Sequence, residues 1–149
     1  MCDCNIKMDQ GILNIRVGAL IIRNQRILVS RKLGFPYEWL PGGRIRMQEN
    51  SEQALWRELK EELGLSMGHA RFLCIHENFF IEQTQNCAYH ELCFYYLVSV
   101  KPDELPDTGM FQFSGTRRYH SYVSLGRYPS TRALRYPTRH PCAPISASG

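Results

Sequence analysis

The sequence predicts an α/β fold of the α+β type, in which a mixed β-sheet packs against helices. Two pairs of strand-like runs, rich in branched and aromatic residues, flank one amphipathic helix near the middle of the 149-residue chain. Strands grouped on both sides of a single helix favour a mixed sheet over repeated parallel β-α-β units. The length and the 44% apolar content suit one domain with a sizeable core.

The first strand pair precedes the helix. Ile12–Ile22 and Ile27–Ser30 are two runs rich in branched apolar residues. Residues 23–26, Arg-Asn-Gln-Arg, separate them and suit the turn of a hairpin. We therefore expect these two runs to pair with each other.

The helix is predicted at about residues 51–63. Its leucines recur every four residues, at Leu55, Leu59 and Leu63. Asn50 or Ser51 offers an N-cap oxygen, and Gln53 would complete a capping box with Asn50. Gly64 supplies the position just past the helix end, where a left-handed backbone penalises residues with a side chain.

The second strand pair follows the helix. Arg71–Ile81 and Tyr89–Val100 are its two runs, and the connecting residues 82–88 contain Gln-Thr-Gln-Asn, which is typical of an exposed turn. A shorter strand is expected at Gly109–Phe113.

Three glutamates on the predicted helix are the first functional candidates. Glu58, Glu61 and Glu62 lie three and four residues apart, so their carboxylates project from one face. Such a cluster is tolerated in water, with Arg57 and Lys60 as partners, or around a hard cation. Ligands that are all oxygen favour magnesium or manganese over zinc.

The loop before the helix favours the metal-binding interpretation. Pro41, Gly42 and Gly43 bring bare backbone close to the start of the helix. A carbonyl group there can join a metal's ligands, and amide groups there can meet a phosphate.

Residues 43–65 combine these features in one pattern, GRIRMQENSEQALWRELKEELGL, in which a glycine, a glutamate and Arg-Glu-Leu-x-Glu-Glu-x-Gly-Leu stand at fixed spacing. The pattern resembles, without a departure, the box of the Nudix hydrolases (MutT-like), enzymes that cleave nucleoside diphosphates linked to another group. The resemblance covers residues 12–113. It implies a Nudix fold, with a mixed sheet sandwiched between helices and the box helix on one side.

The resemblance also implies roles for the box residues. The metal ligands would be the Gly42 carbonyl and the three carboxylates of Glu58, Glu61 and Glu62. Glu58 and Glu61 are the catalytic candidates, because family members differ in which glutamate takes the proton. The structural residues of the box would be Gly43, Glu49, Arg57 and Gly64, with Arg57 paired to Glu49 so that the loop is tied to the helix.

Four residues outside the helix are substrate candidates. Arg31 and Arg44 could contact phosphates and Tyr37 could stack on a base, although surface or packing roles are the commoner fate of such residues. Glu91 stands in a strand dominated by apolar residues. It either lines the cleft or faces solvent in an alternating strand, and both interpretations stay open.

The function that the resemblance implies is hydrolysis of a nucleoside diphosphate linked to another moiety, with Mg²⁺ or Mn²⁺ as the cofactor. A nucleoside triphosphate, ADP-ribose or a related pyrophosphate would be the small-molecule substrate. Two alternatives remain: a non-catalytic sensor of nucleotide or ADP-ribose, and a pyrophosphohydrolase acting on RNA 5′ ends. The intact glutamates favour an enzyme over the sensor, because sensors of this fold commonly lose them.

The chain divides into an N-terminal extension at 1–11, the Nudix domain at 12–113 and a basic tail at 114–149. Past Asp107 come six arginines and no acidic residue, so the net charge of +4 arises entirely there. Prolines interrupt any long helix in this region, and the expected closing helix is not found. A tail that binds nucleic acid is the less favoured interpretation, because composition is weak evidence; we favour a disordered or altered terminus.

The cellular setting is expected to be cytoplasmic. The first ten residues lack the layout of a secretory signal, and no apolar run approaches the roughly 20 residues of a membrane-spanning helix. Six cysteines match no zinc module and are expected to be free thiols. No membrane partner is expected, and a homodimer is compatible with the sequence.

Overall fold

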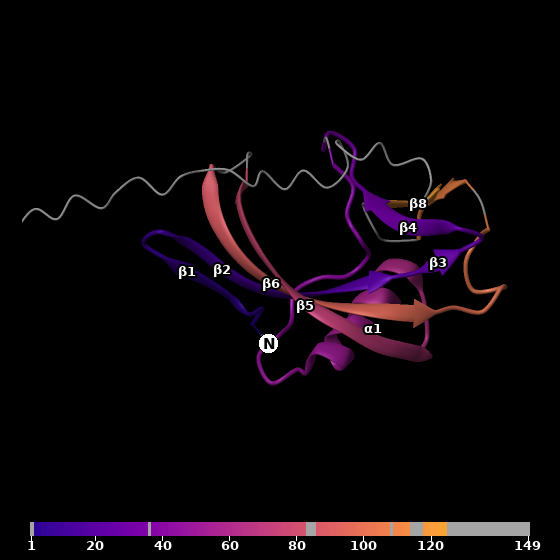
Figure 1. Ribbon diagram of the computed structural model, residues 1–149, viewed down its shortest axis with the longest axis horizontal. Helices are drawn as coiled ribbons and strands as arrows, with labels where there is room; N and C mark the ends of the chain where they lie inside the picture. The colour runs from indigo at the N-terminus through magenta and orange to yellow at the C-terminus, as the bar shows by residue number, and fades with distance from the viewer. Residues whose placement is uncertain (1, 36, 83–85, 108, 114–117, 125–149) are drawn as a thin grey trace, which may run out of the picture.

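The computed structural model describes residues 2–35, 37–82, 86–107, 109–113 and 118–124, which form two four-stranded sheets and one helix (Figure 1). The elements in chain order are β1 (Asn5–Met8), β2 (Gly11–Leu20), β3 (Ile22–Arg23), β4 (Arg26–Arg31), α1 (Ser51–Leu63), β5 (His69–Glu82), β6 (Cys87–Ser99), β7 (Met110–Phe111) and β8 (Tyr119–Ser124). The predicted combination of a mixed sheet with one central helix is confirmed.

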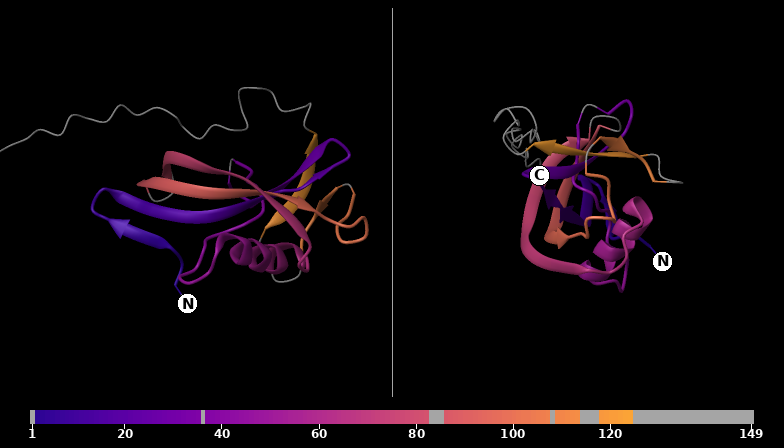
Figure 2. Two further views of the ribbon diagram at one scale, coloured as in Figure 1. Left: turned by 60° about the horizontal axis from the view of Figure 1, so that its bottom comes forward. Right: turned by 90° about the vertical axis from the view of Figure 1, so that its right-hand side faces the viewer.

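The first sheet has the strand order β1-β2-β6-β5. β2 runs parallel to β6, whereas β1 and β5 are antiparallel to their neighbours, so the sheet is mixed as expected. The predicted hairpin after the helix is β5 with β6. α1 lies along one face of this sheet (Figure 2).

The second sheet has the order β3-β4-β8-β7 and is antiparallel throughout. The predicted hairpin before the helix is present only at its tip, where β3 pairs with β4 around Asn24 and Gln25. Both turn residues have positive φ, 49° and 57°, as a tight two-residue hairpin turn requires. The expectation that all of Ile12–Ile22 pairs with Ile27–Ser30 is therefore wrong. β2 already pairs with β1 and β6 in the other sheet.

The predicted bounds of the helix are confirmed, because α1 spans Ser51–Leu63. Asn50 and Gln53 exchange side-chain-to-backbone hydrogen bonds in a capping box, and Gly64 has a left-handed backbone with φ of 67°. The leucine stripe of α1 is fully buried. It packs in one core with residues of both sheets, including Val17, Ala19, Leu28 and Val98.

Strands on both sides of the predicted domain 12–113 join the two sheets. β1 lies within the expected extension 1–11, but it pairs with β2 and is an edge strand of the sheet. β8 lies within the expected tail, but it pairs with β4 and β7. In both cases a neighbouring strand offers unpaired backbone groups that the added strand satisfies. The region 125–149, where a closing helix was sought, lies outside the described residues.

Trp56 on α1 is buried in the core. Cys2, Cys4, Cys74, Cys87 and Cys93 are free thiols. Among the described residues, no helix is long and apolar enough to cross a membrane.

Replacing Asn50 with alanine is expected to lower the free energy of unfolding by about 1 kcal/mol, because the side-chain oxygen caps the backbone N–H of Gln53 at 2.9 Å. Urea unfolding at neutral pH measures this loss. Lys60→Ala is the control, because Lys60 is an exposed residue of the same helix, and it should change the free energy of unfolding little. Asn24 has a positive φ and is therefore unsuitable as an asparagine control. An Asn50→Ala variant as stable as the wild type would contradict the role of the cap.

Candidate active site on the loop before helix α1

The loop that leads into α1 is bonded along the free edge of β2. The Val17 N–H donates to the Gly43 carbonyl at 2.8 Å, and the Ala19 N–H donates to the Pro41 carbonyl at 2.8 Å. Farther along, the Ile45 N–H donates to the Ile15 carbonyl at 3.0 Å. These bonds place the loop against the sheet, so the start of α1 is held in a fixed position beside β2.

Two glycines make this close approach feasible. Gly42 has a φ of 140°, and a Cβ there would run into the carbonyl of Val17. A Cβ on Gly43 would occupy the space of the Glu58 carboxylate. Gly43 thus gives Glu58 its place directly against the loop backbone, which supports the structural role predicted for this glycine.

Arg57 ties the loop to the helix, as the resemblance implies. Its Nε and Nη2 donate to the two carboxylate oxygens of Glu49 at 2.7 and 2.9 Å. Nη2 also donates to the Arg44 carbonyl at 2.8 Å. The hydrogen bonds from Arg57 lower the pKa of Glu49, and burial opposes this shift more weakly. The same bonds to Glu49 raise the pKa of the Arg57 guanidinium. Both side chains are therefore charged near neutral pH.

The Glu49 interaction should make stability depend on pH. Because the folded pKa of Glu49 is lowered, its contribution to stability is complete above the ordinary glutamate pKa of about 4.3 and disappears as pH falls through the folded pKa. We expect wild type to exceed Glu49→Gln in free energy of unfolding at pH 7, and the gap to shrink below about pH 4. Urea titrations of both proteins from pH 7 to 3 measure it; a constant gap would contradict the assignment.

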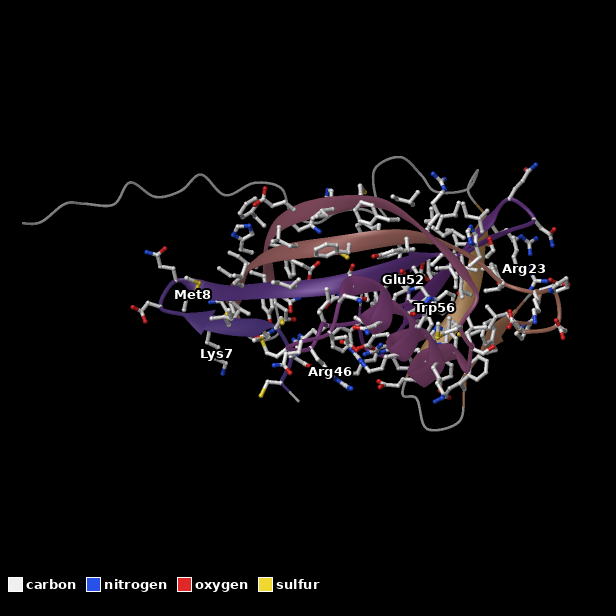
Figure 3. All side chains as sticks on the ribbon, turned by 90° about the horizontal axis from the view of Figure 1, so that it is seen from below. Lys7, Met8, Arg23, Arg46, Glu52 and Trp56 are labelled. Carbon is white, nitrogen blue, oxygen red and sulfur yellow. The ribbon has the colours of Figure 1, made fainter. Side chains whose placement is uncertain are left out.

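The three glutamates of the predicted metal site differ in environment. Glu62 has a side chain that is 6% exposed, whereas Glu58 is 13% and Glu61 51% exposed. Glu58 pairs with Arg57 at 2.6 Å, and Glu61 lies 3.6 Å from both Arg57 and Arg46. Figure 3 shows Arg46 on the loop beside the helix that carries Glu52 and Trp56.

Glu62 is the most deeply placed of the three. Its Oε2 accepts a hydrogen bond from the Gly42 N–H at 3.3 Å, and its Oε1 pairs with the guanidinium of Arg118. Gly42 therefore lies next to the glutamates, although the contact seen is through its amide, and its carbonyl remains a predicted ligand.

The carboxylates share one helix face but do not converge on one point. Within the part of the chain that the structure describes, no three acidic, histidine or cysteine side chains form a group that could hold a metal ion. Each of them is paired with an arginine guanidinium instead. The donor set still suits a hard divalent cation, because all donors are oxygen.

Glu91 is buried, so the solvent-facing interpretation of this residue is wrong. Its side chain is 3% exposed and accepts a hydrogen bond from Asn14 at 2.8 Å, with Arg16 at 3.9 Å. Asn14 is its direct partner across the parallel strands β2 and β6. Glu91 and Arg16 also line a small pocket with Gly18, Trp39, Leu40, Cys93 and Tyr95.

The other substrate candidates lie apart from one another. Arg31 is bound to Glu38 at 2.5 Å, and Tyr37 is half exposed between the rings of Phe35 and Trp39. Arg44 is nearer the box, with its Nε 3.2 Å from the Asn14 side chain. Of the predicted substrate residues, Arg44 and Glu91 thus share a partner, whereas the structure links neither to Arg31 or Tyr37.

Two charged residues near the glutamates, Arg16 and Arg118, were not predicted from the sequence. Arg16 could have been found, because it interrupts an apolar strand as Glu91 does and carries the opposite charge. Arg118 carried no local signal, because only the pairing of β8 with β4 brings it back to the helix.

The fold and this site define an α/β protein with an arginine-tied acidic loop and helix beside a mixed sheet. The chain belongs to the NUDIX family: the model of the NUDIX domain matches residues 13–137. The solved structure of a MutT NUDIX hydrolase from Burkholderia pseudomallei has the same fold, with a TM-score of 0.53 over 78% of this chain and 87% of that chain at 24% sequence identity. The predicted Nudix, MutT-like character is confirmed.

Curated relatives match a shorter stretch. An RNA pyrophosphohydrolase of Blochmanniella pennsylvanica is 37% identical over 68 residues, 44% of this chain and 43% of the relative. An 8-oxo-dGTP diphosphatase of Escherichia coli is 38% identical over 61 residues, 38% of this chain and 47% of the relative. The chain therefore spans less than half the length of these two relatives.

Proposed function

We propose that this protein hydrolyses a nucleoside diphosphate linked to another moiety, with the box glutamates holding a divalent cation. The observation that carries the proposal is the set of three carboxylates on α1, with the buried Glu62 against the Gly42 backbone and Glu58 against Gly43. Carboxylate oxygens are the ligands that a hard divalent cation prefers. Glu58, Glu61, Glu62 and the Gly42 carbonyl would hold Mg²⁺ or Mn²⁺.

The cation would polarise a phosphoryl oxygen, offset charge on the leaving group and lower the pKa of a bound water. The chain contributes position and proton transfer. Glu49 and Arg57 fix the loop, and Gly43 leaves room for Glu58 against it. Glu58 or Glu61 would accept the proton of the attacking water, and the exposed Glu61 can reach solvent to release it.

Substrate contacts are assigned to the polar residues near the box. Arg44 would contact a phosphate, since its side chain is half exposed and close to the loop. Arg16 and Glu91 line the pocket between β2, β6 and Leu40, and they would orient the group next to the diphosphate. Arg31 and Tyr37 would contact the more distant part of a larger substrate.

A second candidate is hydrolysis at an RNA 5′ end, which the name of the Blochmanniella relative favours. The same metal and glutamates would serve it, because a 5′-triphosphate offers the same phosphoanhydride. Binding of the RNA would then weaken steeply with salt, since phosphates beyond the reacting group would contact basic residues. A non-catalytic sensor is the weaker alternative, because all box glutamates are present.

A substrate panel tests the proposal. Nucleoside triphosphates, 8-oxo-dGTP, ADP-ribose, NADH, dinucleoside polyphosphates, sugar nucleotides and a 5′-triphosphorylated RNA would be assayed for release of phosphate, pyrophosphate or nucleotide. Each would be measured with Mg²⁺, with Mn²⁺ and with chelator. We expect metal-dependent turnover of at least one member. Binding of nucleotide without turnover on the whole panel would instead support the sensor.

A further inference from the structure

Arg118 lies beside Glu62, one of the carboxylates that would hold the metal. Its guanidinium pairs with Glu62 Oε1, while the pair of Glu58 with Arg57 is on the adjoining turn of α1. Burial lowers the pKa of Arg118, and the charge of Glu58 opposes this shift. A cation thus already sits beside the buried carboxylate.

The fold holds Arg118 in this place. β8 begins at Tyr119 and pairs with β4 in a fixed register, Tyr119 with Arg31 and His120 with Ser30. Ser30 Oγ and His120 Nδ1 are 3.0 Å apart, and His120 is fully buried. These bonds anchor the start of β8. The position of the Arg118 backbone next to Tyr119 is therefore fixed by the sheet, in addition to the ion pair of its side chain.

A guanidinium and a divalent cation compete for the same carboxylate. Both satisfy the buried negative charge of Glu62, but Arg118 already occupies Oε1 and Gly42 donates to Oε2. A metal that ligates Glu62 must therefore replace the Arg118 contact or share the carboxylate with it, and two neighbouring positive charges repel.

We propose that Arg118 is the internal counterion of Glu62 in the metal-free protein and that a divalent cation displaces it. Arg118 is thus a positioning residue: it keeps the buried carboxylate in place before the metal arrives. Once displaced, the guanidinium stays beside the metal site, where an anionic phosphate is the group it can pair with next. This inference rests on the proposed function, because it requires Glu62 to be a metal ligand.

The test measures Mn²⁺ binding by the whole chain without substrate, by electron paramagnetic resonance of free Mn²⁺ and by calorimetry. We expect Arg118→Ala to bind Mn²⁺ about tenfold more tightly than wild type, since the competing positive charge beside Glu62 is gone. We also expect the melting temperature of Arg118→Ala without metal to be lower than that of wild type. Adding Mn²⁺ should raise its melting temperature by more than it raises that of wild type. Arg118→Gln, which keeps the side-chain bulk, should behave alike if Arg118→Ala folds poorly.

Arg71→Ala is the control for the general effect of removing a positive charge, because Arg71 is exposed on β5 and not on the loop or helix that carry the glutamates. Arg46 is unsuitable, since it lies 3.6 Å from Glu61, another proposed ligand. Equal tightening by Arg71→Ala and Arg118→Ala would overturn the proposal, as would unchanged or weaker Mn²⁺ binding by Arg118→Ala.

Glu62→Gln separates this inference from the proposed function. If Glu62→Gln weakens Mn²⁺ binding while Arg118→Ala has no effect, the metal site stands and the role of Arg118 is overturned. If wild type binds no Mn²⁺, or Glu62→Gln binds it equally well, the metal site itself is wrong and both proposals fail. In the Glu62→Gln background, Arg118→Ala should no longer tighten binding, because the carboxylate for which the two cations compete is gone.

Discussion

Glu62→Gln is expected to lower metal-dependent hydrolysis by on the order of a hundredfold or more. The amide has nearly the shape of the carboxylate but no negative charge, so it is a poor ligand for a hard cation. Glu62 is also the one box carboxylate that is buried beside the Gly42 backbone, so no solvent-exposed group can replace it at that place.

The comparison is made with the best substrate of the panel, at saturating substrate and over a range of Mg²⁺ concentrations. Glu52→Gln is the matched control: it makes the same change on the first turn of α1, at an exposed position away from the three glutamates. Glu52→Gln should retain wild-type rates. A Glu62→Gln enzyme with unchanged kcat at low Mg²⁺ would show that the ligand is misassigned, and Glu58 and Glu61 would then be tested in the same way.

The helix and its ends were predictable because the signals for them are local. The capping box needs only Asn50 and Gln53 three residues apart, and Gly64 marks the end whatever the rest of the chain does. The pair of Glu49 and Arg57 was implied by the resemblance to the Nudix box, and the structure contains it. In each case the partners lie within one short segment that joins the loop to the helix.

The pairing of the N-terminal strands was not predictable in the same way. Ile12–Ile22 has the composition of one strand next to a turn, which suits a hairpin with residues 27–30. In the structure most of that run joins β6, whose partner residues lie more than seventy positions along the chain. Composition specifies that a segment is a strand, but its partner is decided by which edges the whole fold leaves open.

The environment of the carboxylates depends on such distant pairings. The sequence places Glu58, Glu61 and Glu62 on one face of α1, and it indicates nothing about which is buried. Burial of Glu62 comes from the loop bonded along β2, and its counterion comes from the start of β8. Glu91 likewise is buried by its partner Asn14 across the parallel strands. The position of the three glutamates on α1 was therefore predictable, while the charge partners outside the box were not.

Arg57→Ala is expected to lower the free energy of unfolding by about 3 kcal/mol, near the lower limit for loss of one partner of a buried ion pair. Arg57 and Glu49 are 17% and 11% exposed, so solvent screens the loss only partly. The substitution removes both hydrogen bonds to Glu49, the bond to Glu58 at 2.6 Å and the bond to the Arg44 carbonyl. Two carboxylates then remain near each other without their shared cation.

The effect should extend to activity, because the same guanidinium holds both the loop and Glu58. Arg57→Lys distinguishes charge from geometry: an ammonium keeps the positive charge but cannot bridge both oxygens of Glu49 while also contacting Glu58. We expect Arg57→Lys to recover part of the stability and less of the activity. Exposed Arg71→Ala controls for net charge and should change neither. If Arg57→Ala and Arg71→Ala unfold at the same urea concentration as wild type, the loop is held by its backbone bonds to β2 alone, and Arg57 would not be the residue that ties it to α1.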